Sequence, residues 1–169
     1  MRTIIEKISQ RIEDNSDAFM SQGLSKPETI DVYIGQPLAP DQFEFGLPAI
    51  FIDYMADYKN ETLYVYLHVL QDYSEDTENY APDRVNGMRF NDFLTTIKCL
   101  LNGLRIGKAF GVLKLYQETP EQTSDFYYHK ITFSCSIKTD LYAISERYID
   151  TSPVTASVHA GRLKDHSPM

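Results

Sequence analysis

Cysteine is scarce in this chain, tryptophan is absent, and long apolar runs are missing. Cys99 and Cys135 are the two cysteines among 169 residues. Two are too few for the disulfide framework of a secreted domain, so they indicate a reducing compartment, and we predict that both are small buried hydrophobic residues. No stretch approaches the roughly 20 apolar residues of a membrane-spanning helix. The segment 1–15 alternates apolar and charged residues, unlike a secretory signal. We therefore expect a cytoplasmic protein without membrane contact.

Recognised catalytic and cofactor motifs are also missing. The sequence contains no P-loop, dinucleotide fingerprint, nucleophile elbow, zinc-ligand spacing or kinase signature. Cys99 could pair with His68 or His129 as a thiol and base, but Cys99 adjoins Leu100 on the apolar face of a predicted helix, where burial raises the pKa of a thiol. His129 is predicted to be a core histidine. We expect no catalytic residue and no cofactor, and hence a protein that is not an enzyme.

An acidic segment at 72–78 is the one candidate for a metal site. It lacks the glycine and the closing glutamate at the twelfth position that a calcium loop needs for its tight turn and bidentate ligand. We interpret the segment as a solvated loop and predict no metal.

Charge is distributed unevenly along the chain, whose net charge is −8. The segment 53–83 has eight acidic residues against Lys59 alone, whereas 84–139 has eight basic residues against four acidic ones. One interpretation is a solvated surface that keeps the protein soluble. The other is a pair of complementary surfaces that meet head to tail in a ring of copies. The overall acidity argues against specific nucleic-acid binding, which requires neutralisation of phosphates.

Hydrophobic periodicity predicts an α+β fold. We expect an antiparallel sheet of about four to five strands packed on one side by two helices, in a domain over 1–139, followed by a C-terminal arm over 140–169 that orders against a neighbour. A loop of about twenty residues is predicted between the first hairpin and the second helix. The predicted helices are 2–20 and 90–104, the strands are 29–35, 48–55, 61–70, 112–117 and 127–137, and the loop is 71–89.

The strand predicted at 61–70 has two apolar faces. Leu63, Val65 and Leu67 fall on one face, while Tyr64 and Tyr66 fall on the other, because side chains alternate along a strand. We expect helices to cover one of these faces and a neighbouring subunit or another layer to cover the other. The 12 tyrosines of the chain suit such contacts, since tyrosine combines a large apolar area with a polar tip.

Taken in order, these elements resemble the tail terminator or tail completion proteins of long-tailed bacteriophages and prophages, which join the tail to the head. The resemblance covers about residues 1–139, and the extension 140–169 departs from the family pattern. It rests on the N-terminal helix, the segment 47–52, the strand 63–70 with the Gln71-Asp72-Tyr73-Ser74 that follows it, the helix 90–101 and the strand 128–137.

The resemblance implies a virion structural protein that assembles in the host cytoplasm. Such subunits form homo-oligomeric rings, usually hexamers, which cap the tail tube and meet the head connector, with DNA at most passing through the lumen. It also implies that the loop at 71–89 and the C-terminal arm make the contacts between subunits. The contact residues predicted there are Asp72, Tyr73, Glu75, Asp76, Tyr80, Arg84, Arg89, Tyr142 and Tyr148.

Other functions are compatible with the same sequence. A head-tail connector, neck or contractile-baseplate subunit shares the ring geometry and differs in its partners. A small-ligand-binding or enzymatic α+β domain, or a regulatory binding module, would belong to another class. A deep polar pocket would favour ligand binding, whereas a flat apolar patch with a projecting arm would favour assembly.

Overall fold

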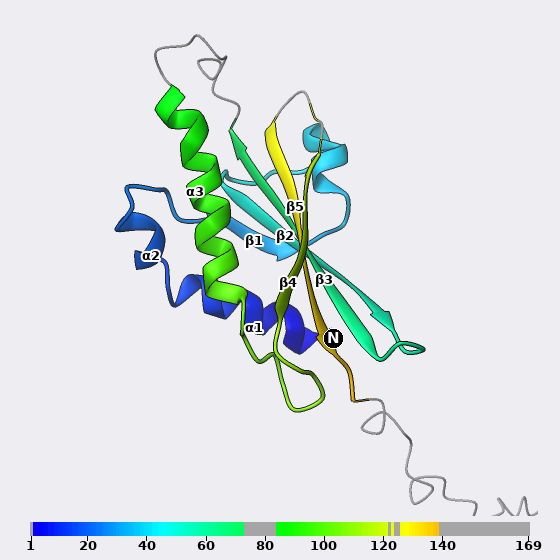
Figure 1. The fold of residues 1–169 in the computed structure, drawn as a ribbon. Helices are drawn as coiled ribbons and strands as arrows, with labels where there is room; N and C mark the ends of the chain where they lie inside the picture. The colour runs from blue at the N-terminus through cyan, green and yellow to red at the C-terminus, as the bar shows by residue number, and fades with distance from the viewer. Residues whose placement is uncertain (1, 73–83, 122, 124–125, 139–169) are drawn as a thin grey trace, which may run out of the picture.

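A computed structural model describes residues 2–72, 84–121, 123 and 126–138 of the chain (Figure 1). Five strands form one sheet, in the order β1-β2-β3-β5-β4. The elements in chain order are α1 (Arg2–Glu13), α2 (Asp17–Met20), β1 (Thr29–Val32), the 3-10 turns η1 (Gln36–Leu38) and η2 (Pro40–Gln42), β2 (Ala49–Asp57), β3 (Thr62–Asp72), α3 (Arg84–Leu101), β4 (Lys114–Glu121) and β5 (Phe126–Ser136).

The α+β fold predicted from the sequence is confirmed, with one pairing that differs. The β2–β3, β3–β5 and β4–β5 pairs are antiparallel, but β1 runs parallel to β2, with Thr29 opposite Ala49 and Val32 opposite Ile52. The parallel pairing arises because residues 33–48 cross over the sheet before β2 begins, instead of turning back in a hairpin. We call residues 33–48 the crossover segment.

The main core lies between the sheet and the helices α1 and α3. In α1 the isoleucines at positions 4, 8 and 12 are fully buried, because their spacing of four residues places them on one side of the helix. Phe19 of α2 contacts Phe93 of α3, with 5.0 Å between the ring centroids. Each buried side chain of this size stabilises the fold by about 1.5–3 kcal/mol relative to exposure.

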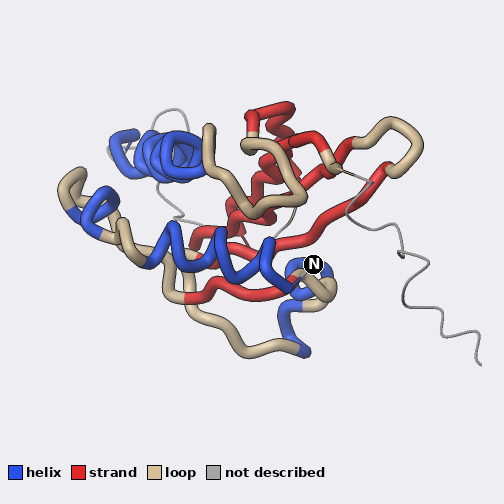
Figure 2. Tube along the Cα trace, turned by 90° about the horizontal axis from the view of Figure 1, so that it is seen from below, coloured by secondary structure: helices blue, strands red, loops and turns tan. Residues whose placement is uncertain are grey.

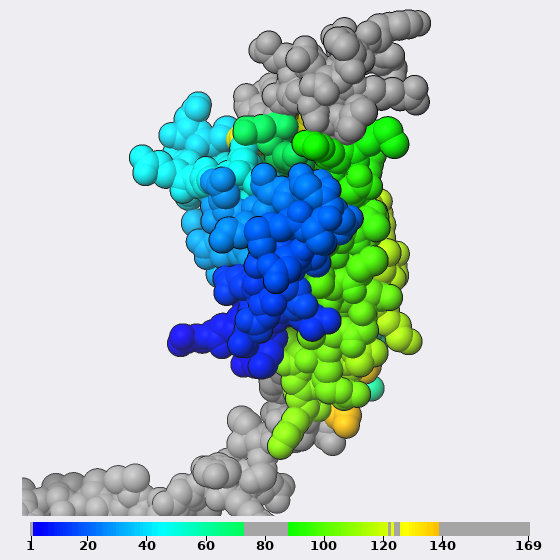
Figure 3. Space-filling model, turned by 90° about the vertical axis from the view of Figure 1, so that its left-hand side faces the viewer, coloured from blue at the N-terminus to red at the C-terminus, as the bar shows by residue number. Residues whose placement is uncertain are grey.

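The two long helices lie across one another on this face of the sheet. Figure 2 shows α3 nearly end-on and α1 lengthwise. In the space-filling view, α1 and α2 (blue) lie against α3 (green), with the crossover segment (cyan) beside them (Figure 3). Contacts between α1 and α3, and between α2 and α3, join the N-terminal region to the rest of the domain.

Several predicted boundaries are wrong. The first helix is interrupted after Glu13 and resumes as α2. The loop predicted at 71–89 is shorter, because β3 continues to Asp72 and α3 already begins at Arg84. The strand predicted to end at Gln117 continues to Glu121 as β4. The last two errors lie where charged or polar residues occupy regular structure with a solvated side, so that hydrophobic periodicity fades before the element ends. The first helix is instead interrupted by the polar residues 14–16, which form a turn.

The prediction that both cysteines are buried is wrong for Cys99, which is exposed. The buried side of α3 includes Ile97 and Leu101, and a residue midway between two positions four apart faces the opposite side of a helix. Cys135 in β5 is buried as predicted, with 6% exposure, and burial raises the pKa of its thiol. Cys99 is therefore an exposed residue on the side of α3 that faces away from the core.

Candidate functional site

The face of the sheet opposite the helices, here called the outer face, carries a row of aromatic side chains. Tyr64, Tyr66 and His68 of β3 alternate with residues of the main core, so they point away from the helices. The crossover segment covers one half of this face and leaves the other half open. The prediction that both faces of β3 are apolar or aromatic is confirmed. The crossover segment of the same chain covers part of the second face.

The covered half is a second, smaller apolar cluster. Phe45 of the crossover segment meets Phe51 of β2 edge to face, with 5.2 Å between the ring centroids. The segment can return over the sheet because it turns at Gly35, whose φ of 98° suits glycine. The buried side chain of Gln36 fixes this turn, since its amide donates to the carbonyl of Val32 and accepts from the backbone N–H of Ile34, both at 2.8 Å.

His68 lies at the centre of the covered half. Its ring stacks on Tyr33 of the crossover segment, with 3.8 Å between centroids and 10° between planes. Its Nδ1 lies 2.5 Å from the hydroxyl of Tyr128, within hydrogen-bond distance. Burial, assisted by the positive charge of Lys130, lowers the pKa of His68 to about 4, and burial raises the pKa of Tyr128. His68 is therefore neutral at pH 7 and serves as a packing and hydrogen-bonding group.

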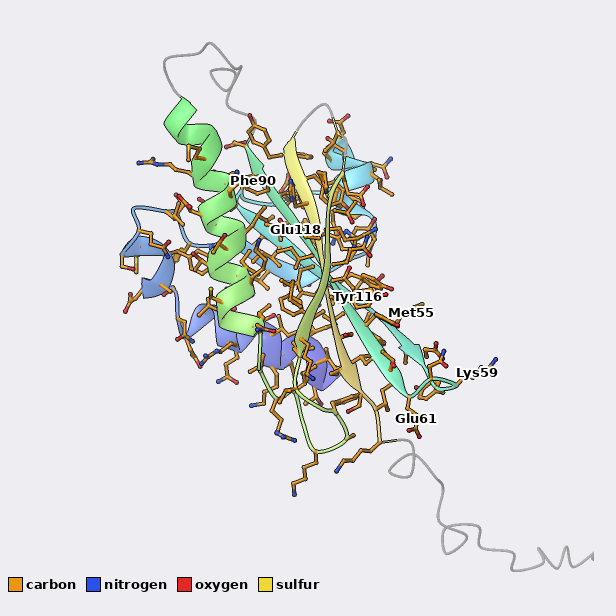
Figure 4. The ribbon with its side chains drawn as sticks, viewed as in Figure 1. Met55, Lys59, Glu61, Phe90, Tyr116 and Glu118 are labelled. Atoms are coloured by element: carbon orange, nitrogen blue, oxygen red, sulfur yellow. The ribbon has the colours of Figure 1, made fainter. Side chains whose placement is uncertain are left out.

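The open half, here called the open sheet face, is built from Met55, Tyr64, Tyr66 and Tyr116. Met55 of β2 is 49% exposed and Tyr116 of β4 is 61% exposed. The rings of Tyr64 and Tyr116 meet edge to face at 5.4 Å. Tyr66 is half-buried between them and the covered half, and burial raises its pKa. Figure 4 shows Met55 and Tyr116 on this side of the sheet.

The most exposed aromatic ring of this face lies at a bulge in β4. The register of β4 against β5 shifts by one residue at Tyr116. Leu115 pairs with Phe133 and Gln117 pairs with Thr132, so Tyr116 between them is an extra residue without a partner position in β5. Such bulges redirect a side chain and increase the local twist. Tyr116 lies two residues after Lys114 and so on the same face, and the bulge brings Gln117 to that face beside it.

The β2–β3 hairpin extends the open sheet face beyond the body of the domain (Figures 1 and 4). At its tip Asp57 accepts hydrogen bonds from the side chain and the backbone N–H of Asn60, at 2.7 and 3.0 Å, and these bonds lower the pKa of Asp57. The carbonyl of Glu61 accepts from the N–H of Ile137 at 2.7 Å. Met55 and Tyr64 pair directly across the two strands, so the hairpin holds both in fixed register.

A charged network lies on the helix side of the sheet. Glu118 of β4 accepts from Lys98 of α3 at 2.7 Å through one oxygen and lies 3.2 Å from Nδ1 of His129 through the other. Burial raises the pKa of Glu118, but the hydrogen bonds and charges of Lys98 and His129 outweigh it and lower the pKa overall. Both carboxylate oxygens are occupied, so Glu118 serves to connect α3 to the edge strand.

Three of the contact residues predicted from the sequence lie in the described ranges, away from the open sheet face. Asp72 is exposed at the end of β3, Arg89 is exposed on α3, and Arg84 begins α3. Asp72 lies on the outer face but at its covered end, and α3 lies on the helix side of the sheet, so the structure does not bring these three to the open sheet face. The other predicted contact residues, which are Tyr73, Glu75, Asp76, Tyr80, Tyr142 and Tyr148, lie outside the described residues.

Sequence reasoning missed Met55 and Tyr116 as surface residues. The signal for their face was present in the alternation of tyrosines along β3, but the partner strands of β3 were needed to show which side chains surround them.

Two classes of feature are absent from the described part of the chain. Residues 2–72, 84–121, 123 and 126–138 contain no group of three or more His, Cys, Asp or Glu side chains placed to hold a metal ion. No helix in these ranges is long and apolar enough to span a membrane. Comparison with protein-family models and with curated proteins found no match to the sequence.

Proposed function

We propose that this protein is a structural subunit of a phage or prophage tail, which forms a homo-oligomeric ring at the end of the tail and joins the head connector to the tail tube. The observation that carries the proposal is the open sheet face. A sheet face normally packs against another layer. Here the chain covers half of that face itself and leaves an aromatic half exposed.

The composition of the open sheet face is that of a protein contact surface. Tyrosine and methionine are enriched in the centres of protein interfaces, and this face also carries the charged residues Asp53, which pairs with Tyr66, and Lys114. Contiguous exposed apolar patches on soluble domains commonly mark interaction sites. A small molecule is usually held in a mostly apolar concave pocket, whereas the hollow that adjoins this face is lined largely by polar residues, among them Thr62, Ser134 and Ser136.

The titratable groups of the described residues support a structural role. His68 is enclosed and neutral, and Glu118 has both oxygens engaged. Neither combines with a nucleophile at a cleft in the way that a general acid or base requires. This is the physical basis for proposing a protein that is not an enzyme.

The order of elements supports the choice of a tail protein. The described chain has helices, a short strand, a hairpin, a long helix and a second hairpin in succession, which is the order on which the resemblance to tail terminator and tail completion proteins rests. The proposal therefore includes their location, in the virion and in the host cytoplasm during assembly, with a ring that is usually a hexamer.

Two experiments test the proposal. Light scattering coupled to size-exclusion chromatography, over a wide range of protein concentration, should give a mass that is a multiple of the protomer, and electron microscopy of the same sample should show rings. Mass spectrometry of virions purified from the host should detect the chain. A protomer mass at every concentration, together with absence from virions, would overturn the proposal.

A further inference from the structure

One stretch of the chain, which begins at the β1 edge of the sheet, is acidic and carries no basic residue. Between Lys26 and Lys59 the chain contains six acidic residues and no lysine or arginine. This stretch includes β1, which is an edge strand, and the crossover segment, which runs over the outer face as far as β5, where the ring of Phe45 lies 5.8 Å from that of Phe126. We use the name acidic edge for the exposed acidic residues of this stretch and the exposed apolar residues among them. Its carboxylates are Glu28, Asp31, Asp41 and Glu44.

Large apolar side chains are exposed among these carboxylates. Val32 at the end of β1 is 42% exposed, and Ile34 and Leu38 of the crossover segment are 67% and 77% exposed. An acidic surface with three protruding apolar side chains differs from an ordinary solvated edge, because solvation alone favours polar side chains at such positions.

The open sheet face lies beside basic residues at the opposite edge of the sheet. From Asn102 to Gln117 the chain contains three basic residues and no acidic one. These are Arg105, Lys108 and Lys114, and all three are exposed. Lys114 pairs with Ser134 in β4–β5 register on the outer face, two residues from Tyr116. None of the three forms an ion pair with another residue in the described ranges.

We propose that the acidic edge of one copy docks on the open sheet face of the next copy. In this contact the exposed Leu38 and Ile34 cover Tyr116 and Met55 of the neighbour, while the carboxylates approach Lys108 and Lys114. The crossover segment already covers half of its own outer face, and the segment of the next copy completes the cover. This inference rests on the proposed ring, and it names the surfaces by which the ring closes.

The acidic edge and the open sheet face are two different surfaces of one subunit, so a contact between them is head to tail. A heterologous contact of this kind repeats from copy to copy, and it closes into a ring when the rotation between neighbours divides a full turn, whereas a two-fold contact would stop at a dimer. Opposite charges on the two surfaces select this arrangement over contacts between like surfaces.

The contact uses side chains instead of extending the sheet. β4 carries a bulge at Tyr116 and a proline at position 120, both of which hinder pairing of an edge strand with another chain. At the other edge β1 has four residues, and the side chain of Gln36 occupies the carbonyl of Val32. Neither edge offers a long free strand for hydrogen bonding.

Charge reversal on each surface tests the contact. The first variant is Asp31→Lys with Glu44→Lys, and the second is Lys108→Glu with Lys114→Glu; all four side chains are exposed, so circular dichroism should show an unchanged fold. We expect each variant alone to raise the concentration for half-assembly by on the order of tenfold or more. An equimolar mixture of the two should assemble again, because each reversed surface then meets a reversed partner. The controls are Lys7→Glu on α1 and Asp14→Lys directly after it.

The wild-type chain provides a second measurement. Raising NaCl from about 50 mM to about 500 mM should shift its half-assembly concentration upward, since screening weakens contacts between exposed charges. Three results would overturn this contact and leave the proposed function standing. They are wild-type rings that resist salt, charge-reversed variants that assemble like the controls, and a mixture of the two variants that fails to assemble. A wild-type protein that is a monomer throughout would overturn the proposed function and this contact together.

Discussion

Tyr33 lies flat on His68, with 3.8 Å between the ring centroids and 10° between the ring planes. This stacking attaches the crossover segment to the sheet, because Tyr33 directly follows β1 and His68 lies in β3. Tyr33 is half-buried and His68 is buried. The histidine therefore stays enclosed only while the crossover segment is in place, and its protonation is coupled to that cover.

The first prediction concerns the pH dependence of stability. Burial lowers the pKa of His68 from 6.5 to about 4, so the unfolded chain binds a proton to His68 at a higher pH than the folded chain does. The contribution of His68 is complete above pH 6.5, decreases as the pH falls toward 4, and levels off below that value. The loss should reach about 3 kcal/mol at most, measured by urea unfolding at a series of pH values.

The control for this prediction is the double variant His68→Phe with Tyr128→Phe, which removes the titrating group and its hydrogen-bond partner together. Carboxylates such as Glu118 and Asp57, whose pKa values are also lowered, contribute equally to both proteins. The variant should therefore show a shallower decline between pH 6.5 and 4. An identical decline in the two proteins would exclude His68 as its source.

The second prediction concerns the contact between α2 and α3. Phe93 is buried against Phe19, so Phe93→Ala should lower the free energy of unfolding by about 3–5 kcal/mol through lost burial and the cavity left behind. Met88→Ala on the same helix is the control, because Met88 is 59% exposed and should change stability by less than about 0.5 kcal/mol. Urea unfolding of both variants makes the comparison, and equal effects would contradict the assignment of Phe93 to the core.

The sequence was most informative where burial alone determines the pattern. The alternation of Leu63, Val65 and Leu67 predicted β3, and the spacing of Phe93 and Ile97 predicted the second half of α3. The parallel direction of β1 could not be predicted, because a strand of four residues with one neighbour has the same alternation in either direction. The open sheet face needed the cross-strand register, since only the pairing of Met55 with Tyr64 and the contact between Tyr64 and Tyr116 show which side chains gather there.

The third prediction concerns Gly111, which lies where the loop before β4 approaches β5. Its N–H donates to the carbonyl of Ser136 at 2.8 Å, and a Cβ at this position would lie 2.6 Å from Oγ and 3.3 Å from the backbone nitrogen of Ser136. Gly111→Ala should therefore destabilise the fold by about 1 kcal/mol or more. Gly107→Ala in the same loop is the control, because its Cβ would meet only Phe110 at an ordinary 3.8 Å. A thermal unfolding midpoint that is the same in both variants would contradict the close approach.

The fourth prediction concerns the ion pair between Glu118 and Lys98. Both side chains are about one quarter exposed, at 28% and 24%, so solvent reduces their attraction. A double-mutant cycle with Glu118→Gln and Lys98→Met should give a coupling energy of up to about 1 kcal/mol, and added salt should decrease it. A coupling that stays constant in high salt would indicate packing of the aliphatic stems in place of charge attraction.

The last prediction compares two methionines of equal exposure on opposite sides of the molecule. Met55 on the open sheet face is 49% exposed, and Met20 at the end of α2 is 52% exposed. Because the two have similar exposure, replacing either with serine should leave the free energy of unfolding nearly unchanged. If the open sheet face is the contact surface, Met55→Ser removes apolar area from the interface, whereas Met20→Ser does not. The concentration for half-assembly should then rise about fivefold to tenfold for Met55→Ser alone, as expected for a loss of about 1 kcal/mol at an interface. Light scattering at matched concentrations measures this difference. Equal behaviour of the two variants would mean that assembly uses another surface, and the open sheet face would then need a different partner.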